Sequence, residues 1–345
     1  MTPRGLSPDP GEADLNRFFQ LVGFPAQARE WWNRFYEPDE VALVLSLDQR
    51  HDPELSGEPP PRHLETPAAM AGQVKRAIKR GVLDRLPDGR LGAADFHVRF
   101  ELWALFEGWM DVPRAVREAL LEWEMAAFEE RNQSLLNALA SGGAVDPGRI
   151  RPRTVLLSEA LALLGKVEHI FLWPCNCRSM AGRCSKPVLT CLRFANDRDL
   201  GWEISRSRAR EMTREAHTKG LMHSAEVAVL PDGEITGALC HCCHDCCFPH
   251  RLGASRGLQG LYPEKRHQAV LAAEACSGCG RCIKRCPAGA FEARDTTASN
   301  KRHVVFQAQK CLGCGLCVST CPEGALGMIP SRHHSDPDFE SLLCP

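Results

Sequence analysis

The first part of the chain distributes its apolar and polar positions with a helical period. Residues 14–36 carry apolar side chains at helical spacing and include a run of aromatic residues. A second helix is predicted over 66–80, opened by a Thr-Pro pair, and two long amphipathic helices over 94–109 and 113–139. The pattern predicts an α-helical domain over residues 1–145.

A short hairpin is expected inside this helical domain. Strand residues 82–83 and Leu91 flank the turn Pro87-Asp88-Gly89, and the hairpin with its neighbouring helices resembles a winged helix. Seven Lys or Arg residues stand against four Asp or Glu residues over 64–100. A face that binds DNA is expected to be more strongly basic, so the excess of three cations also suits a solvated helix surface.

The pattern changes near residue 150, where shorter elements alternate. It predicts a helix over 157–168, an apolar strand over 170–173, a helix over 206–219 that starts after Ser205, and a hairpin over 224–240. We expect these elements to form a small α/β domain.

The predicted fold class of the whole chain is α+β. It combines an α-helical N-terminal domain, an α/β middle domain rich in cysteine and a small cysteine-rich C-terminal module. The predicted boundaries are 1–145, 150–262 and 266–330, with a polar tail over 331–345.

Cysteine is the unusual feature of the composition. The chain has 345 residues, 44% apolar and 25% charged, with a net charge of −1, which is ordinary for a globular protein of two or three domains. It has 18 cysteines and none before Cys175. With no export signal or membrane span visible in the sequence, we expect a cytoplasmic protein in which these thiols bind metal, and an organism that lives with little oxygen.

One cysteine phrase occurs twice near the end of the chain. CSGCGRCIKRCPAGA at 276–290 and CLGCGLCVSTCPEGA at 311–325 both have the spacing C-x2-C-x2-C-x3-C-P. Zinc knuckles also use CxxC pairs, but this doubled spacing is the signature of two-cluster ferredoxins, in which each cluster takes its fourth thiolate from the other copy. The signature predicts two [4Fe–4S] clusters. The expected ligands are Cys276, Cys279, Cys282 and Cys321 for the first, and Cys311, Cys314, Cys317 and Cys286 for the second.

Nine more cysteines fall in two groups in the middle domain, and both groups are expected at strand ends. The candidate ligands are Cys175, Cys177, Cys184, Cys191, Cys240, Cys242, Cys243, Cys246 and Cys247. One or more further [4Fe–4S] clusters, zinc, and free thiols that act in disulfide chemistry all remain open. His241, His244 and His250 could replace a thiolate. We expect the two groups to converge in space.

Several segments together resemble a family of bacterial ferredoxin-type proteins. They are WPCNCR (173–178), KPVLTCL (186–192), the helix and GLMH over 205–223, CHCCHDCC (240–247) and the two ferredoxin motifs. The resemblance implies a helical, winged-helix-like region, a cysteine-rich domain and a two-cluster ferredoxin in one chain.

The sequence favours an electron-transfer protein or an electron-feeding oxidoreductase subunit of anaerobic metabolism. No dinucleotide or P-loop motif is visible, so neither a nucleotide nor a flavin site is expected, and the partners are expected to be redox proteins rather than nucleic acid or membranes. The C-x3-C-x2-C motif of radical S-adenosylmethionine enzymes also fails, because His250 stands where its last cysteine is needed. A reductase with its active site in the middle domain and a redox-sensing DNA-binding regulator are the alternatives.

Overall fold

The computed structural model describes residues 9–51, 71–86, 89–146, 149–296, 299–331 and 337–343. They divide into two compact units: residues 1–127 with 197–200, and residues 128–196 with 201–345. The start of the predicted helix at 66–80 and most of the turn at 87–89 lie outside the described residues. Both helices and strands are present throughout, as the predicted α+β class requires.

The first unit is helical apart from one hairpin. Its elements are α1 (Glu12–Val22), η1 (Ala26–Trp31), α2 (Trp32–Phe35), α3 (Pro38–His51), α5 (Ala71–Arg80), β1 (Leu83–Arg85), β2 (Leu91–Ala93), α6 (Phe96–Phe106), η3 (Trp109–Asp111) and the first half of α7 (Arg114–Ser141). β1 and β2 pair antiparallel, which confirms the predicted hairpin. Aromatic rings fill the core, with Phe35 packed edge-on to Phe96 at 5.1 Å between ring centres.

The buried side chain of Arg99 links several segments around this aromatic core. The guanidinium of Arg99 is fully buried and donates two hydrogen bonds to the carboxylate of Glu107, at 2.8 and 2.6 Å. It also donates to the carbonyl oxygens of Phe35 at 2.6 Å and Arg80 at 3.0 Å. A buried charge is tolerated when its partners satisfy it in this way.

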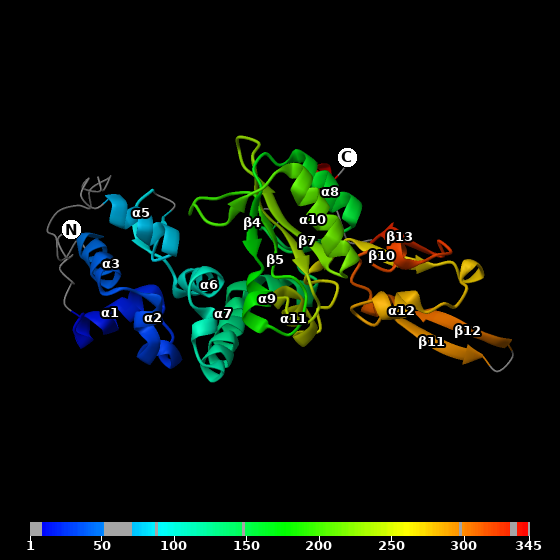
Figure 1. Cartoon of the computed structure of the whole chain (residues 1–345), viewed down its shortest axis with the longest axis horizontal. Coiled ribbons are helices and arrows are strands. Elements are labelled where there is room, and N and C mark those ends of the chain that lie inside the picture. Colours follow the sequence, from blue (N-terminus) through cyan, green and yellow to red (C-terminus); the bar gives the residue numbers. More distant parts are fainter. Residues whose placement is uncertain are drawn as a thin grey trace. The chain divides into compact units, whose positions relative to one another are not determined.

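The second unit is built on a seven-stranded sheet (Figure 1). Its strand order is β6-β4-β5-β8-β7-β3-β9, antiparallel except for the parallel pair β3 and β9. The strands are β3 (Arg153–Val155), β4 (Phe171–Pro174), β5 (Leu189–Arg193), β6 (Trp202–Glu203), β7 (Met222–Val229), β8 (Ile235–Cys242) and β9 (Glu264–Lys265). The helices between them are α8 (Leu157–Lys166), α9 (Asn176–Ala181), α10 (Arg206–Thr218) and α11 (Phe248–Ser255). The predicted helices, the predicted first strand and the hairpin are therefore present, with β8 extending to Cys242.

One face of this sheet carries the hydrophobic core. α8 and α10 lie side by side on it (Figure 1), and Leu163, Leu192, Ala209 and Leu239 are buried between helices and sheet. Ser205 caps α10 as predicted, because its hydroxyl accepts a hydrogen bond from the backbone N–H of Arg208 at 3.2 Å.

The ferredoxin part has two antiparallel pairs of strands. β10 (His267–Leu271) pairs with β13 (Leu326–Pro330), and β11 (Phe291–Thr296) pairs with β12 (Ser299–Phe306). Short helical turns carry the cysteine loops: η4 (Ala273–Ala275), α12 (Arg281–Arg285), η5 (Ala308–Lys310) and η6 (Val318–Thr320).

The segment expected to be a polar tail contributes to the core. It contains α13 (Pro337–Leu343), and Phe339, Leu342 and Leu343 are buried with the residues of α8. Polar and charged residues together make up most of this tail, so its few apolar side chains on one helical face gave no clear signal in the sequence pattern.

Candidate metal centres

The eight cysteines of the ferredoxin motifs gather around two cavities. The first is lined by Cys276, Cys279, Cys282 and Cys321, which we call the outer set. The second is lined by Cys286, Cys311, Cys314 and Cys317, which we call the inner set. Each cavity therefore receives three cysteines from one motif and the last cysteine of the other. This grouping is the one that the crossed ligand scheme requires; ligation itself stays a prediction.

The inner set is closely enclosed by its surroundings. Cys311, Cys314 and Cys317 are all buried, and burial raises the pKa of both Cys314 and Cys317 to about 12. Thiols held this way become thiolates when a cation or cluster compensates their charge, because the protein interior disfavours an isolated anion. The four thiols fit a cubane cluster by number and by chemistry.

Two glycines allow the inner loop to pack closely. Gly313 and Gly315 both have positive φ, at 73° and 71°. A Cβ at Gly313 would lie 2.3 Å from the carbonyl oxygen of His267, and one at Gly315 would lie 2.9 Å from a methyl carbon of Leu156. The loop can therefore approach β10 and the start of α8 only without side chains at these positions.

Comparison with known families supports this arrangement. Residues 275–325 match the family of the 4Fe-4S dicluster domain. The match implies two 4Fe-4S clusters in this part of the chain and supports an iron–sulfur electron-transfer role. No curated protein and no solved structure matches the chain.

Six of the nine middle-domain thiols form a series of interacting neighbours. In order along the series they are Cys175, Cys177, Cys247, Cys242, Cys240 and Cys191, which we call the six-thiol set. Both cysteine groups of the sequence contribute to it. The predicted convergence of the two groups is thus confirmed, and the metal ligation of these residues stays a prediction.

The alternation of side chains along the sheet builds this set. In β5 and β8, Leu192 and Leu239 are register partners that point into the helix-covered core. Their neighbours Cys191 and Cys240 therefore lie together on the opposite face, because successive strand residues point to opposite sides. Cys242, two residues after Cys240, lies on the same face.

The thiols of the six-thiol set differ in how readily they ionise. Hydrogen bonds from Cys191 and Cys242 hold the pKa of Cys240 well below its usual value. Hydrogen bonds from Cys177 and Cys242 lower the pKa of Cys247 to about 6. The lowered pKa values of Cys240 and Cys247 suit thiols that bind a metal as thiolates.

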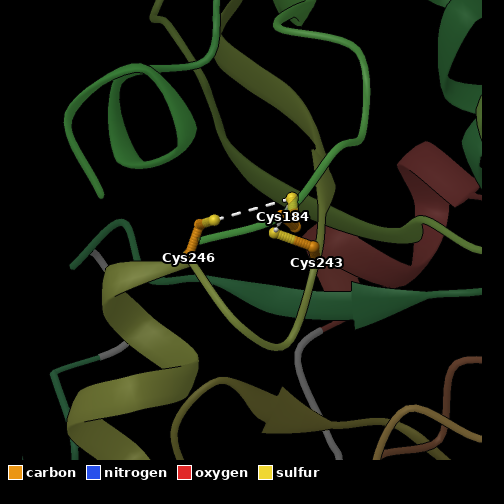
Figure 2. Close-up of side chains that lie close together, drawn as sticks. All are labelled: Cys184, Cys243 and Cys246. Carbon is orange, nitrogen blue, oxygen red and sulfur yellow. Dashed lines mark hydrogen bonds between the residues drawn. The ribbon is translucent and has the colours of Figure 1, made fainter. Parts of the chain in front are cut away.

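The remaining three thiols form a second, smaller group. The Sγ atom of Cys184 lies 3.6 Å from that of Cys243 and 3.6 Å from that of Cys246, and all three lie within 4.8 Å of one another. Figure 2 shows the three side chains pointing toward one another; Cys243 and Cys246 come from the turn after β8, and Cys184 comes from the loop between α9 and β5. We call this group the three-thiol set.

Arg178 lies between the two middle groups. Its buried guanidinium donates to the carbonyl oxygens of Pro187 at 2.5 Å and His241 at 2.7 Å. Although burial opposes it, the nearby thiols Cys175 and Cys243 raise the pKa of Arg178 above its usual value. Arg178 is thus a fixed cation that serves both thiol groups. Sequence analysis missed it; its place three residues after Cys175, in one turn of α9, was the available signal.

The six-thiol set also packs against the dicluster domain. Its members Cys242 and Cys247 pack in one group of buried side chains with Cys314 and Leu316 of the second ferredoxin motif. Arg285 of the first motif donates to the carbonyl oxygens of His217 and Thr218, the latter at 2.9 Å, at the C-terminal end of α10. A cation at a helix C-terminus interacts favourably with the free carbonyl groups there.

Two of the histidines considered as possible ligands, His241 and His250, are buried. His241 faces the helix layer, where its Nε2 lies 3.1 Å from the hydroxyl of Thr213. His250 is buried, and burial lowers its pKa to about 3. Among the described residues, no histidine joins the group of close metal-ligating side chains.

Proposed function

We propose that this protein passes single electrons between partner proteins through the outer set, the inner set and the six-thiol set, in that order or its reverse. A 4Fe–4S cluster supplies one-electron chemistry when it is bound by four thiolates. The proposal rests on two packing contacts, one between the outer and inner sets and one between the inner set and the six-thiol set.

The outer and inner sets are direct neighbours. The two sets pack together in one group of buried and partly buried side chains. The outer set contributes Cys282 and Cys321 to it, and the inner set contributes Cys286, Cys311 and Cys317. The inner set packs against the six-thiol set in a different group of buried side chains, to which the inner set contributes Cys314. These two packing contacts support a linear arrangement in which the inner set lies between the outer set and the six-thiol set.

The outer end of this series faces solvent. Cys279 is exposed, and the adjacent loop carries Arg281 and Lys284, both also exposed. A partner with an acidic face could approach this end, because exposed cations attract and orient it. We infer that electrons enter or leave through the outer set.

The six-thiol set is the proposed inner terminus. Its donors are thiols only, and Arg178 supplies a buried positive charge that stabilises the anionic form of the site. Four of the six thiols suffice for one further 4Fe–4S cluster.

The described part of the first unit gives little support to a DNA-binding role. Of the cations counted over 64–100, Arg76 pairs with Asp39 at 2.9 Å, Arg80 with Glu37 at 2.6 Å and Arg99 with Glu107 at 2.6 Å. Carboxylates therefore already neutralise cations that phosphate contacts would need.

Metal analysis and redox titration of the anaerobically purified full chain test the proposal. We expect about twelve irons per chain and three one-electron centres. The Cys240→Ser variant should lose about four irons and one centre, and keep the signals of the dicluster domain. Chemically reduced protein that carries only about eight irons and no third centre would contradict the six-thiol terminus.

A further inference from the structure

The nine middle-domain thiols belong to two sites of different chemistry. We propose that the three-thiol set of Cys184, Cys243 and Cys246 binds a single tetrahedral metal ion of the zinc class, and that its fourth coordination position is open to solvent. This site is separate from the electron path proposed above.

The spacing of the sulfurs carries the first step. With metal–sulfur bonds of about 2.3 Å, a tetrahedral ion holds its thiolates about 3.8 Å apart. Two of the distances in the three-thiol set are 3.6 Å, and all its sulfurs lie within 4.8 Å of one another. The set thus has the dimensions of one ion.

The dicluster domain provides an internal standard for the alternative. In a cubane cluster each thiolate binds a different iron, so the sulfurs stand further apart than around one ion. Within the described residues, the three-thiol set is the one group of three metal-ligating side chains that falls within 4.8 Å. Neither the cluster-binding loops nor the six-thiol set is that compact, which separates the three-thiol set from both.

The fourth position is open. In the part of the chain that the structure describes, no fourth cysteine, histidine or carboxylate lies within 4.8 Å of all three sulfurs. Cys184 is only partly buried, so water has access on its side. Three protein ligands and one exchangeable position are the arrangement of catalytic rather than structural zinc sites.

The surrounding charges suit this composition. Three thiolates and a divalent ion carry a net charge of about −1. Arg178 interacts with Cys243, and Arg251 interacts with Cys246. These guanidinium groups compensate the excess negative charge of the site.

Zinc and iron counted in the same samples test the proposal. The full chain, purified anaerobically and freed of loosely bound metal, should contain about one zinc beside its iron. The Cys184→Ser variant should lose that zinc and keep its iron. The matched variant Cys191→Ser, which changes the six-thiol set, should lose about four irons and keep the zinc. Loss of iron with retention of zinc in Cys184→Ser would overturn the proposal.

Zinc-edge X-ray absorption of the unaltered protein gives a readout that does not depend on the folding of a variant. We expect about three sulfur neighbours at about 2.3 Å and one lighter oxygen neighbour. Four sulfur neighbours would overturn the open position, and absence of zinc after incubation with Zn²⁺ would overturn the site. Because zinc and iron are counted separately, a failure of this site leaves the proposed electron path untouched, and the reverse also holds.

Discussion

The outer and inner thiol sets share a spacing and differ in their surroundings. Gly280 and Gly315 are equivalent positions, each directly after the second cysteine of its motif, and both have a φ of 71°. A Cβ at Gly280 would meet nothing closer than Ile283 at 3.8 Å, whereas one at Gly315 would lie 2.9 Å from a methyl carbon of Leu156. In the same inner loop, a Cβ at Gly313 would lie 2.3 Å from the carbonyl oxygen of His267. A repeat can therefore conserve its donors while one copy faces solvent and the other is packed into the protein.

The largest expected effect comes from the last cysteine of the first motif. Cys286 lines the inner cavity although its own motif lines the outer one. Cys286→Ser should therefore damage the inner cluster, and Cys321→Ser the outer cluster, each with a loss of up to about four irons. Electron paramagnetic resonance of the reduced variants distinguishes the two clusters. The crossed scheme would be wrong if Cys286→Ser left the buried cluster intact and removed the exposed one.

Alanine at Gly280 and at Gly313, the more closely packed glycine of the inner loop, should separate the cost of a positive φ from the cost of a steric clash. Gly280→Ala should cost about 1–2 kcal/mol, because its φ is unfavourable for a side chain but its space is open. Gly313→Ala should cost about 1–3 kcal/mol more, because the carbonyl of His267 must move. Urea unfolding monitored by tryptophan fluorescence measures both. Equal losses of stability would show that the inner loop is not tightly packed.

The contacts of Glu159 test how the segments next to the inner set are stabilised. Its carboxylate accepts hydrogen bonds from Arg266 at 2.7 Å and the Leu156 N–H at 2.7 Å, and lies 2.8 Å from His267. Although burial opposes it, these contacts lower the pKa of Glu159 below its usual 4.5. Glu159→Gln should cost about 1–3 kcal/mol at neutral pH.

The pH dependence follows from the sign of that shift. A carboxyl group whose pKa is lower in the folded state stabilises the fold above its unfolded pKa, and the contribution disappears as pH falls through the folded value. The difference between Glu159→Gln and the unaltered chain should stay constant at neutral pH and shrink only below about pH 4.5. Glu340→Gln is the matched control, since Glu340 also binds Arg266 but is 44% exposed. A larger loss in the control would contradict this account.

The smallest effect is expected on the outer side. Arg281 and Lys284 are exposed, so salt screens their influence on a nearby cluster. Replacing both with glutamine should lower the outer cluster's potential slightly and should weaken the salt dependence of electron transfer with an acidic partner protein. Arg208→Gln, an exposed change on α10, is the control. Unchanged potentials together with an unchanged salt dependence would count against any role of the loop cations.

Local signals in the sequence predicted the elements that position the candidate sites. Ser205 predicted the start of α10, and the turn at 231–233 predicted the β7–β8 hairpin. The cysteine spacing predicted the dicluster domain. The short strands β3 and β9 were not predicted, because two or three residues are too few for a recognisable period.

The division of the nine middle thiols could not be read from the sequence. Cys242 and Cys243 are adjacent, as are Cys246 and Cys247, yet in each pair one belongs to the six-thiol set and the other to the three-thiol set. At this strand end and turn, adjacent side chains point in different directions, so spacing along the chain says little about which sulfurs meet. Only the folded sheet decides the grouping.

The alternation along β8 has a consequence for assembly. A slip of β8 by one residue against β5 and β7 would turn Cys240 and Cys242 into the helix layer and bring Leu239 and His241 to the thiol face. Such a misfolded chain would offer a bound group hydrocarbon and imidazole in place of two sulfurs. Metal binding would therefore select the native strand register, because only a chain with its strands in native alignment presents the full set of donors.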